Sequence, residues 1–164
     1  MSVSLREMEP EDMPAVLEIW NQVVEEGGSI PFEEPLDEGS LGMILADAES
    51  YVAVEASDFG ETVVGMYCVH PNILGRCSHV ANATYLVAAG HRGKHIGGMM
   101  VLDSIEKARK AGFRAIQFNG VVKSNVHAVN LYKRCGFEVV GEIPESFRVK
   151  DGHYENGLVM YRKL

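Results

Sequence analysis

The most informative stretch of this chain is AGHRGKHIGG, residues Ala89 to Gly98. It separates a strand-like run, His79 to Ala88, from a segment with helical periodicity, Gly97 to Ala111. Glycines let the backbone turn tightly and bring several N–H groups close to phosphate oxygens, and a helix start adds roughly half a positive charge. The stretch therefore predicts an anion site, with Arg92 and Lys94 as local cations. The alternative is a merely tight strand-to-helix turn.

Other readings of this stretch fit less well. It contains neither the Gly-Lys-Ser/Thr of a nucleoside-triphosphate loop nor the Gly-x-Gly-x-x-Gly of a dinucleotide site. His91 and His95 stand four apart, a spacing seen in zinc helices, but the expected helix begins near them and no third ligand follows in register. We therefore expect no metal site.

Bulk properties are those of a soluble globular domain, and we expect residues 1–164 to form a single one. Hydrophobic residues make up 46% and charged residues 23%, and the net charge of -8 argues against a nucleic-acid partner. Cys68, Cys77 and Cys135 show no paired spacing, which suits a reducing compartment. The segment Met1 to Pro10 does not resemble a signal peptide, and no apolar run reaches the ~20 residues of a membrane span. We expect a cytoplasmic protein without membrane contact.

The periodicity of the remaining sequence predicts a mixed α/β sheet covered by helices, in the order β-α-α-β-β-β-α-β-α-β-β. Strands are expected at Val3 to Met8, Tyr51 to Ala56, Thr62 to Val69, His79 to Ala88, Phe113 to Val122, Phe137 to Ile143 and Leu158 to Leu164. Helices are expected from Pro10 to the Gly27-Gly28 pair, from Leu41 to Ala48, from Gly97 to Ala111, and from Ser124 to Cys135. Ser124 is a candidate cap of the last helix.

The last expected helix carries a second motif. It reads N-x-x-A-x-x-L-Y-x-x-x-G-F from Asn125 to Phe137. Together with the run from Arg92 to Gly97, it makes nearly the whole chain resemble the GNAT superfamily, the Gcn5-related N-acetyltransferases. Members share a phosphate-cradling Arg/Gln-x-x-Gly-x-Gly/Ala motif. The usual middle glycine is His95 here, which costs on the order of 1 kcal/mol if that position needs a positive φ.

The resemblance implies the GNAT fold, a mostly antiparallel central sheet splayed at the cofactor site and flanked by helices. It also implies acetyl-CoA as cofactor. The cofactor-binding positions are then Leu86, Val87, Arg92, Gly93, Lys94, His95, Ile96, Gly97, Gly98, Asn125 and Tyr132. Backbone amides of Leu86 and Val87 would bind the pantetheine arm and the acetyl carbonyl. Tyr132 would be the general acid for the departing thiolate, and Asn125 would bind the cofactor arm, cap its helix, or both.

A closer resemblance, to a GNAT subgroup, is carried by Pro71-Asn72, Gly75-Arg76, Ser78 to Ala83 and Gln117 to Asn119. That subgroup includes the fungal N-acetyltransferase that acts on proline analogues such as azetidine-2-carboxylate. By this resemblance Asn82 and Asn119 face the substrate, and Asn119 takes part in catalysis. An amide in an apolar strand must find some partner, so a purely structural role for Asn82 is equally open.

The proton acceptor is the least defined element. His79, on the strand that leads to the loop, is the candidate base. Glu33 and Glu34 are candidates for the substrate pocket, with a solvated acidic loop as the alternative. The function expected is direct acetyl transfer to the amine of a small molecule, an amino acid or analogue, by a chain that could form a homodimer. The alternatives are acetylation of a protein N-terminus or lysine, and a non-catalytic acyl-CoA-binding module.

Overall fold

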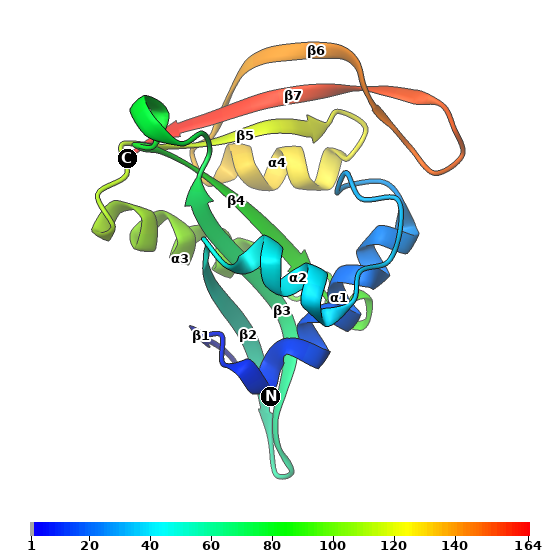
Figure 1. Cartoon of the computed structure of the whole chain (residues 1–164), viewed down its shortest axis with the longest axis vertical. Helices are drawn as coiled ribbons and strands as arrows, with labels where there is room; N and C mark the ends of the chain where they lie inside the picture. Colours follow the sequence, from blue (N-terminus) through cyan, green and yellow to red (C-terminus); the bar gives the residue numbers. More distant parts are fainter. Residues whose placement is uncertain (1) are drawn as a thin grey trace.

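Residues 2–164 are described by a computed structural model, in which one seven-stranded sheet carries helices on both faces (Figure 1). The strand order is β1-β2-β3-β4-β5-β7-β6. The strands are β1 Val3–Glu7, β2 Glu49–Ser57, β3 Gly60–Pro71, β4 Val80–Val87, β5 Ala115–Val122, β6 Glu138–Arg148 and β7 Tyr154–Lys163. The helices are α1 Met13–Glu26, α2 Glu38–Leu45, α3 Ile96–Lys110 and α4 Val126–Arg134, with short 3-10 turns η1 Pro10–Asp12, η2 Gly75–Cys77 and η3 Ala89–His91.

The predicted order of strands and helices is confirmed, while several boundaries are wrong. The strand expected to end at Ile143 continues to Arg148, and its partner begins at Tyr154 rather than Leu158. This outer part of the β6–β7 hairpin is largely exposed on both faces, so no apolar alternation marks it in the sequence. The last helix is capped by Asn125 rather than Ser124, because the Asn125 side chain accepts the amide of Ala128.

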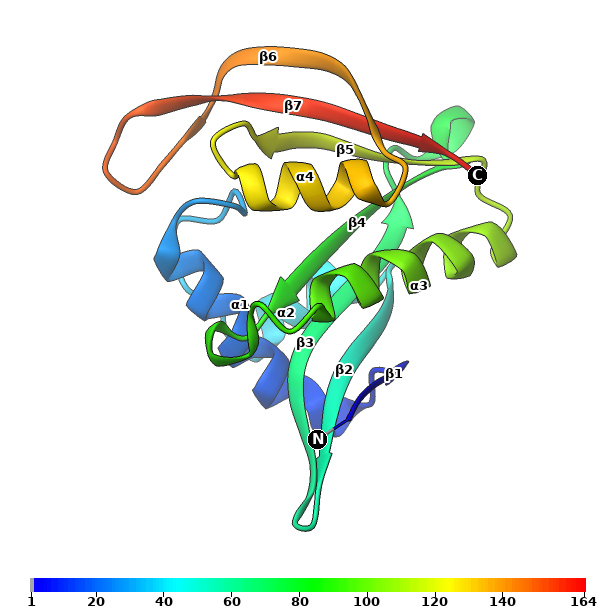
Figure 2. The same cartoon turned by 180° about the vertical axis from the view of Figure 1, so that it is seen from behind.

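The sheet is antiparallel except at its centre, where β4 and β5 run parallel and soon part. Their ladder contains two residue pairs, Val80 with Ala115 and Ala81 with Ile116. Beyond these pairs the two strands diverge, as both views show (Figures 1 and 2). The expected splay of the central sheet is therefore confirmed, and it opens toward the C-terminal end of β4.

Two hydrophobic cores hold helices against the sheet, one on each face. Alternation along β2 sends Tyr51 and Ala53 into the core beneath α3 and α4, and Val52 and Val54 into the core beneath α1 and α2. Figure 2 shows α3 and α4 on one side of the sheet, and Figure 1 shows α1 and α2 on the other. The helices thus flank the gap between β4 and β5 from both faces.

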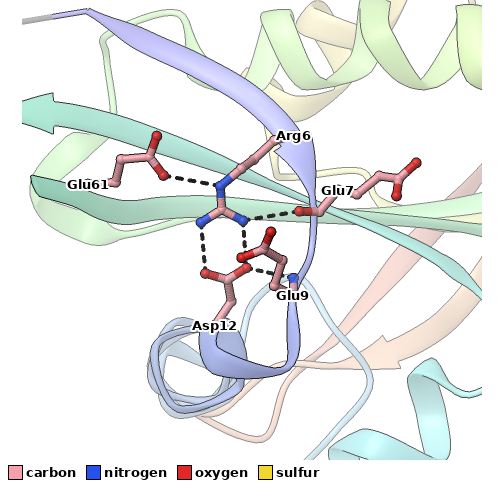
Figure 3. A network of polar contacts seen from close by, with 5 residues as sticks. All are labelled: Arg6, Glu7, Glu9, Asp12 and Glu61. Atoms are coloured by element: carbon pink, nitrogen blue, oxygen red, sulfur yellow. Dashed lines mark hydrogen bonds and ion pairs between the residues drawn. The ribbon is translucent and has the colours of Figure 1, made fainter.

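A polar network fixes the start of α1 against the first strands (Figure 3). The guanidinium of Arg6, on β1, binds both carboxylate oxygens of Asp12 at 2.7 and 3.0 Å, and its Nε lies 3.1 Å from the Glu61 carboxylate on β3. Asp12 also accepts the backbone amide of Glu9 at 2.8 Å, which closes the turn before α1. The side chain of Asp12 is 8% exposed, so these hydrogen bonds replace water that the carboxylate has lost.

We predict that Asp12→Asn lowers the free energy of unfolding at neutral pH by about 1–3 kcal/mol, because it removes a charged hydrogen-bond acceptor from a nearly buried site. The hydrogen bonds from Arg6 lower the pKa of Asp12 in the folded protein. Its contribution is therefore complete above the unfolded-chain pKa and is lost as pH falls through the lower folded value. Urea denaturation at several pH values measures both effects.

The matched control is Glu61→Gln, which changes the other carboxylate of the same network. Glu61 is 51% exposed, so this substitution should cost less than about 0.5 kcal/mol. If Asp12→Asn is no more costly than Glu61→Gln, or if its stability falls as steeply with acid as that of the parent protein, the assigned role of Asp12 is wrong.

Candidate functional site

The gap between β4 and β5 exposes the backbone of β4 near its end. Ala88 donates its amide to the carbonyl of Val64 on β3 at 2.9 Å. Since successive amides of a strand point to opposite edges, the amide of Val87 points toward β5, beyond the last β4–β5 pair. The amide of Leu86 points to β3. Of the two predicted backbone donors, only Val87 is oriented toward the gap.

The glycine-rich stretch turns tightly between η3 and α3. Gly93 has φ 77° and His95 has φ 62°, ψ 12°, so both lie in the left-handed region, and His95 is the N-cap of α3. Position 95 therefore does adopt a positive φ, the case in which a histidine costs more than a glycine. Gly97 and Gly98 have a further role: a Cβ on either would lie 3.4 to 3.5 Å from Leu131 of α4, so their small size lets the two helices approach.

A cavity of about 610 Å³ lies over this turn and the open edge of β4; we name it the donor cavity. Of the predicted cofactor-binding residues, those lining it are Leu86, Val87, Arg92, Gly93, Gly97, Asn125 and Tyr132. Ile96 is 1% exposed and belongs to the core beneath α3, so its side chain is structural. The side chains of Lys94 and His95 are exposed outside the cavity wall, and Gly98 packs against α4.

Arg92, the arginine that lines the donor cavity, is already paired with a carboxylate. Arg92 donates to both carboxylate oxygens of Glu26, at 2.8 and 2.7 Å, and its Nε donates to the Val87 carbonyl at 3.2 Å. The hydrogen bonds to Glu26 raise the pKa of Arg92. Glu26 is the last residue of α1, 66 positions before Arg92, and it lines the same cavity. An anion bound there must therefore compete with this carboxylate for Arg92.

Tyr132 stands between the donor cavity and a second one. It projects from α4 and packs on Phe118 of β5, with ring centroids 4.5 Å apart, and on Tyr85 of β4, 6.0 Å away. Burial raises the pKa of Tyr132 to about 12, so its hydroxyl is protonated at neutral pH. Asn125, whose capping role is confirmed, lies beside it and lines both cavities.

The second cavity, of about 560 Å³, continues from the first along the gap; we name it the acceptor cavity. The two share Ser29, Tyr85, Asn125, Ala128 and Tyr132 as wall residues. Aromatic side chains form much of the acceptor-cavity wall, among them Trp20, Phe32, Phe118 and Phe147.

The two predicted glutamates line a hollow that adjoins the acceptor cavity. Glu33 and Glu34 lie between the segment after α1 and the β6–β7 hairpin, and Glu33 pairs with Arg148. This hollow and the acceptor cavity share wall residues, namely Ile30, Pro31, Phe32, Ser146 and Phe147, but neither glutamate lines the acceptor cavity itself. A role for Glu33 and Glu34 in substrate binding stays a prediction.

Four carboxamides form a cluster at the edge of the acceptor cavity, and two of them line it. Asn72 and Asn119 donate to each other, at 3.0 and 2.7 Å, and Asn82 donates to the Asn72 oxygen at 3.2 Å. Gln117 donates to the Asn119 oxygen at 3.0 Å. Asn82 in turn accepts the backbone amide of Ala83 at 2.8 Å. The structural role left open for Asn82 is thus present, and Asn82 and Asn119 both line the cavity.

The predicted base, His79, lies outside both cavities. It is exposed in the turn before β4, and its carbonyl accepts the amide of Arg114 at 2.8 Å. The histidine of the acceptor cavity is His70, which pairs with Asn82 across β3 and β4. His70 was not predicted because the expected strand ends at Val69. One further residue of strand places His70, two positions after Cys68, on the same face as Cys68.

A family profile described as acetyltransferase (GNAT) family matches residues 10–137, which include the turn, the gap and α4 up to Phe137. The chain belongs to the GNAT acetyltransferase family. Acetyl-CoA is the acyl donor of this family. The expected fold is confirmed as well.

Similar proteins differ in length and in the function that their names state. N-acetyltransferase aca1 of Schizosaccharomyces pombe is 33% identical over 102 residues, which are 62% of this chain and 48% of aca1, so the match spans about half of that relative. An L-methionine sulfoximine/L-methionine sulfone acetyltransferase of Pseudomonas paraeruginosa is 29% identical over 150 residues, which are 88% of this chain and 86% of that enzyme.

Among solved structures, a GCN5-related N-acetyltransferase from Kribbella flavida matches this GNAT chain with a TM-score of 0.91 and 35% identity, over 99% of this chain and 98% of that protein. Within residues 2–164, no helix is long and apolar enough to cross a membrane. The same residues hold no group of three or more His, Cys, Asp or Glu side chains arranged to bind a metal ion.

We predict that His95→Gly stabilises this GNAT protein by about 0.5–1 kcal/mol, because glycine adopts the left-handed conformation of residue 95 without strain. The free energy of unfolding, measured in urea, tests this. His91→Gly is the control, since the positive-φ residues other than glycine in residues 2–164 are His95 and Glu145. Glycine at position 91 should destabilise, and equal losses for both variants would contradict the strain at His95.

Proposed function

We propose that this chain transfers the acetyl group of acetyl-CoA to the amine of a small molecule, an amino acid or analogue, by direct attack in a ternary complex. The observation that supports this most directly is that Tyr132 lines both cavities where they meet at the open edge of β4. A group bound in the donor cavity and an amine bound in the acceptor cavity would meet beside one protonated phenol.

The residues of the donor cavity fit acetyl-CoA. The turn at Gly93 and the start of α3 provide amide groups and a helix N-terminus for phosphate oxygens. The amide of Val87 points into the gap, where it can donate to a carbonyl oxygen that gains negative charge. Arg92 would hold a phosphate once it leaves Glu26. When bound, the thioester supplies an activated acetyl group.

The chemistry of the acceptor cavity supports an amine with a nearby oxygen acceptor, such as a carboxylate. A carboxamide oxygen accepts two hydrogen bonds. The Asn72 oxygen takes them from Asn119 and Asn82, and the Asn119 oxygen takes them from Asn72 and Gln117. Asn119 lines the cavity, and because its oxygen is filled and one of its N–H groups bonds to Asn72, it keeps its second N–H for a ligand oxygen. The amino-acid derivatives named for the Pseudomonas relative have such oxygens.

The first test is release of free thiol from acetyl-CoA in the presence of an amine panel. The panel contains methionine sulfoximine, methionine sulfone, azetidine-2-carboxylate, a polyamine and a lysine-containing peptide. We expect turnover with one or more of the amino-acid analogues. Turnover with the peptide alone would favour a protein acetyltransferase, and acetyl-CoA binding without thiol release would favour a non-catalytic module.

We predict that Tyr132→Phe lowers kcat by roughly 10²-fold, because the departing thiolate loses its proton donor. Acetyl-CoA affinity, measured by calorimetry, should stay within about threefold, since the ring is retained. The control is Tyr154→Phe, which removes the hydroxyl of a tyrosine that is 58% exposed on β7, and it should leave kcat unchanged. An unchanged kcat in Tyr132→Phe refutes the acid role.

We predict that Asn119→Ala raises the KM of the amine about tenfold, with a smaller effect on the KM of acetyl-CoA, because the cluster loses N–H groups that face the acceptor. Asn156→Ala, on the β6–β7 hairpin outside both cavities, is the matched control. A loss of thermal stability with an unchanged KM would instead assign Asn119 a structural role.

A further inference from the structure

The acceptor cavity holds a histidine whose surroundings define its proton chemistry. His70 and Cys68 are two residues apart on β3, and they pair with Asn82 and Thr84 on β4. All four line the acceptor cavity, so His70 borders the space proposed for the amine. Directly paired side chains lie about 4.5–5.5 Å apart at Cβ, which puts His70 next to the carboxamide cluster.

The hydrogen bonding of the ring selects one nitrogen. Nδ1 of His70 lies 2.8 Å from the carbonyl oxygen of Pro71. A carbonyl oxygen only accepts hydrogen bonds, so Nδ1 carries the hydrogen. In the neutral imidazole Nε2 is then the atom with a free lone pair. The Pro71 carbonyl therefore holds the tautomer in which Nε2 can take up a proton.

The other titratable groups of the acceptor cavity are poor proton acceptors. Burial raises the pKa of the Cys68 thiol to about 11 and of the Tyr132 hydroxyl to about 12, and it raises the pKa of Tyr85 further. Considering residues 2–164 alone, no lysine, arginine, aspartate or glutamate side chain lines this cavity. An imidazole is the side chain suited to accept a proton near neutral pH.

We infer that His70 Nε2 is the general base of the acetyl transfer, a role that rests on the proposed function. As the amine nitrogen forms a bond to the thioester carbonyl carbon, His70 Nε2 takes the proton that the nitrogen loses. The carbon–sulfur bond then breaks with its electron pair on sulfur, and Tyr132 gives its hydroxyl proton to that sulfur. His70 releases its proton to water and Tyr132 regains one, so a neutral amine and acetyl-CoA yield the amide and free thiol.

The test compares His70→Gln with the parent protein, using the panel amine with the highest kcat/KM. Rates are measured from about pH 5.5 to 9.5 and expressed per concentration of free amine. The parent should keep an acid limb after this correction, because protonated His70 cannot accept a proton. His70→Gln should lose this limb and about 10²–10³-fold in kcat near neutral pH, while binding acetyl-CoA like the parent.

Two further variants serve as references. His153→Gln changes a histidine on the exposed β6–β7 turn, where Asp151 and Glu155 are its partners, and it should keep the parent profile. His79→Gln should do the same, because His79 lies outside both cavities. Addition of imidazole to His70→Ala should restore part of the activity in a saturable way, which a loss of packing alone would not produce.

The possible outcomes separate this inference from the function on which it rests. Turnover by the parent with an unchanged pH profile in His70→Gln overturns the role of His70 and leaves the acetyltransferase function intact. If the rate of the parent, expressed per concentration of free amine, shows no fall at acid pH, the role of His70 is also overturned. This outcome does not depend on whether the variants fold. Absence of thiol release from the parent with every amine overturns the proposed function and His70 together.

Discussion

The early end of the pairing between β4 and β5 is the constraint on which the rest of this structure depends. The amide of Ala83 faces β5, but it is taken by the side chain of Asn82 at 2.8 Å instead of by the neighbouring strand. A side-chain oxygen thus replaces a ladder partner directly after the last pair, at Ala81. The strands can then separate without leaving the Ala83 amide unpaired. An unpaired buried backbone amide would cost free energy.

Both cavities follow from this separation. Toward the end of β4, the free edge presents the amide of Val87 beside the turn that starts α3. Toward β5, Asn82 and Asn119 of the carboxamide cluster line the acceptor cavity, together with Tyr132 of α4. A continuous sheet would fill the same space with hydrogen bonds between strands. The fold therefore gives up part of its ladder to create the two adjoining cavities.

Several side chains at this place show compromises between stability and binding. His95 holds a left-handed conformation that glycine would adopt more easily. Arg92 is bound to Glu26, so the donor cavity carries an internal carboxylate where a phosphate is expected. Asn82 serves the backbone and the acceptor wall at once. Such local costs are commonly found where a protein binds or reacts rather than in its framework.

The sequence by itself determined the order of the elements, the turn from Arg92 to Gly97 and the helix with Tyr132, because periodicity and glycine spacing are local properties. Contacts between distant residues were decided only by the tertiary structure. Arg92 meets Glu26 across 66 positions, and Arg148 of the exposed outer hairpin meets Glu33 across 115. That His70 rather than His79 lines the acceptor cavity has the same origin: which histidine faces the cavity depends on strand register, and register is set by the neighbouring strand.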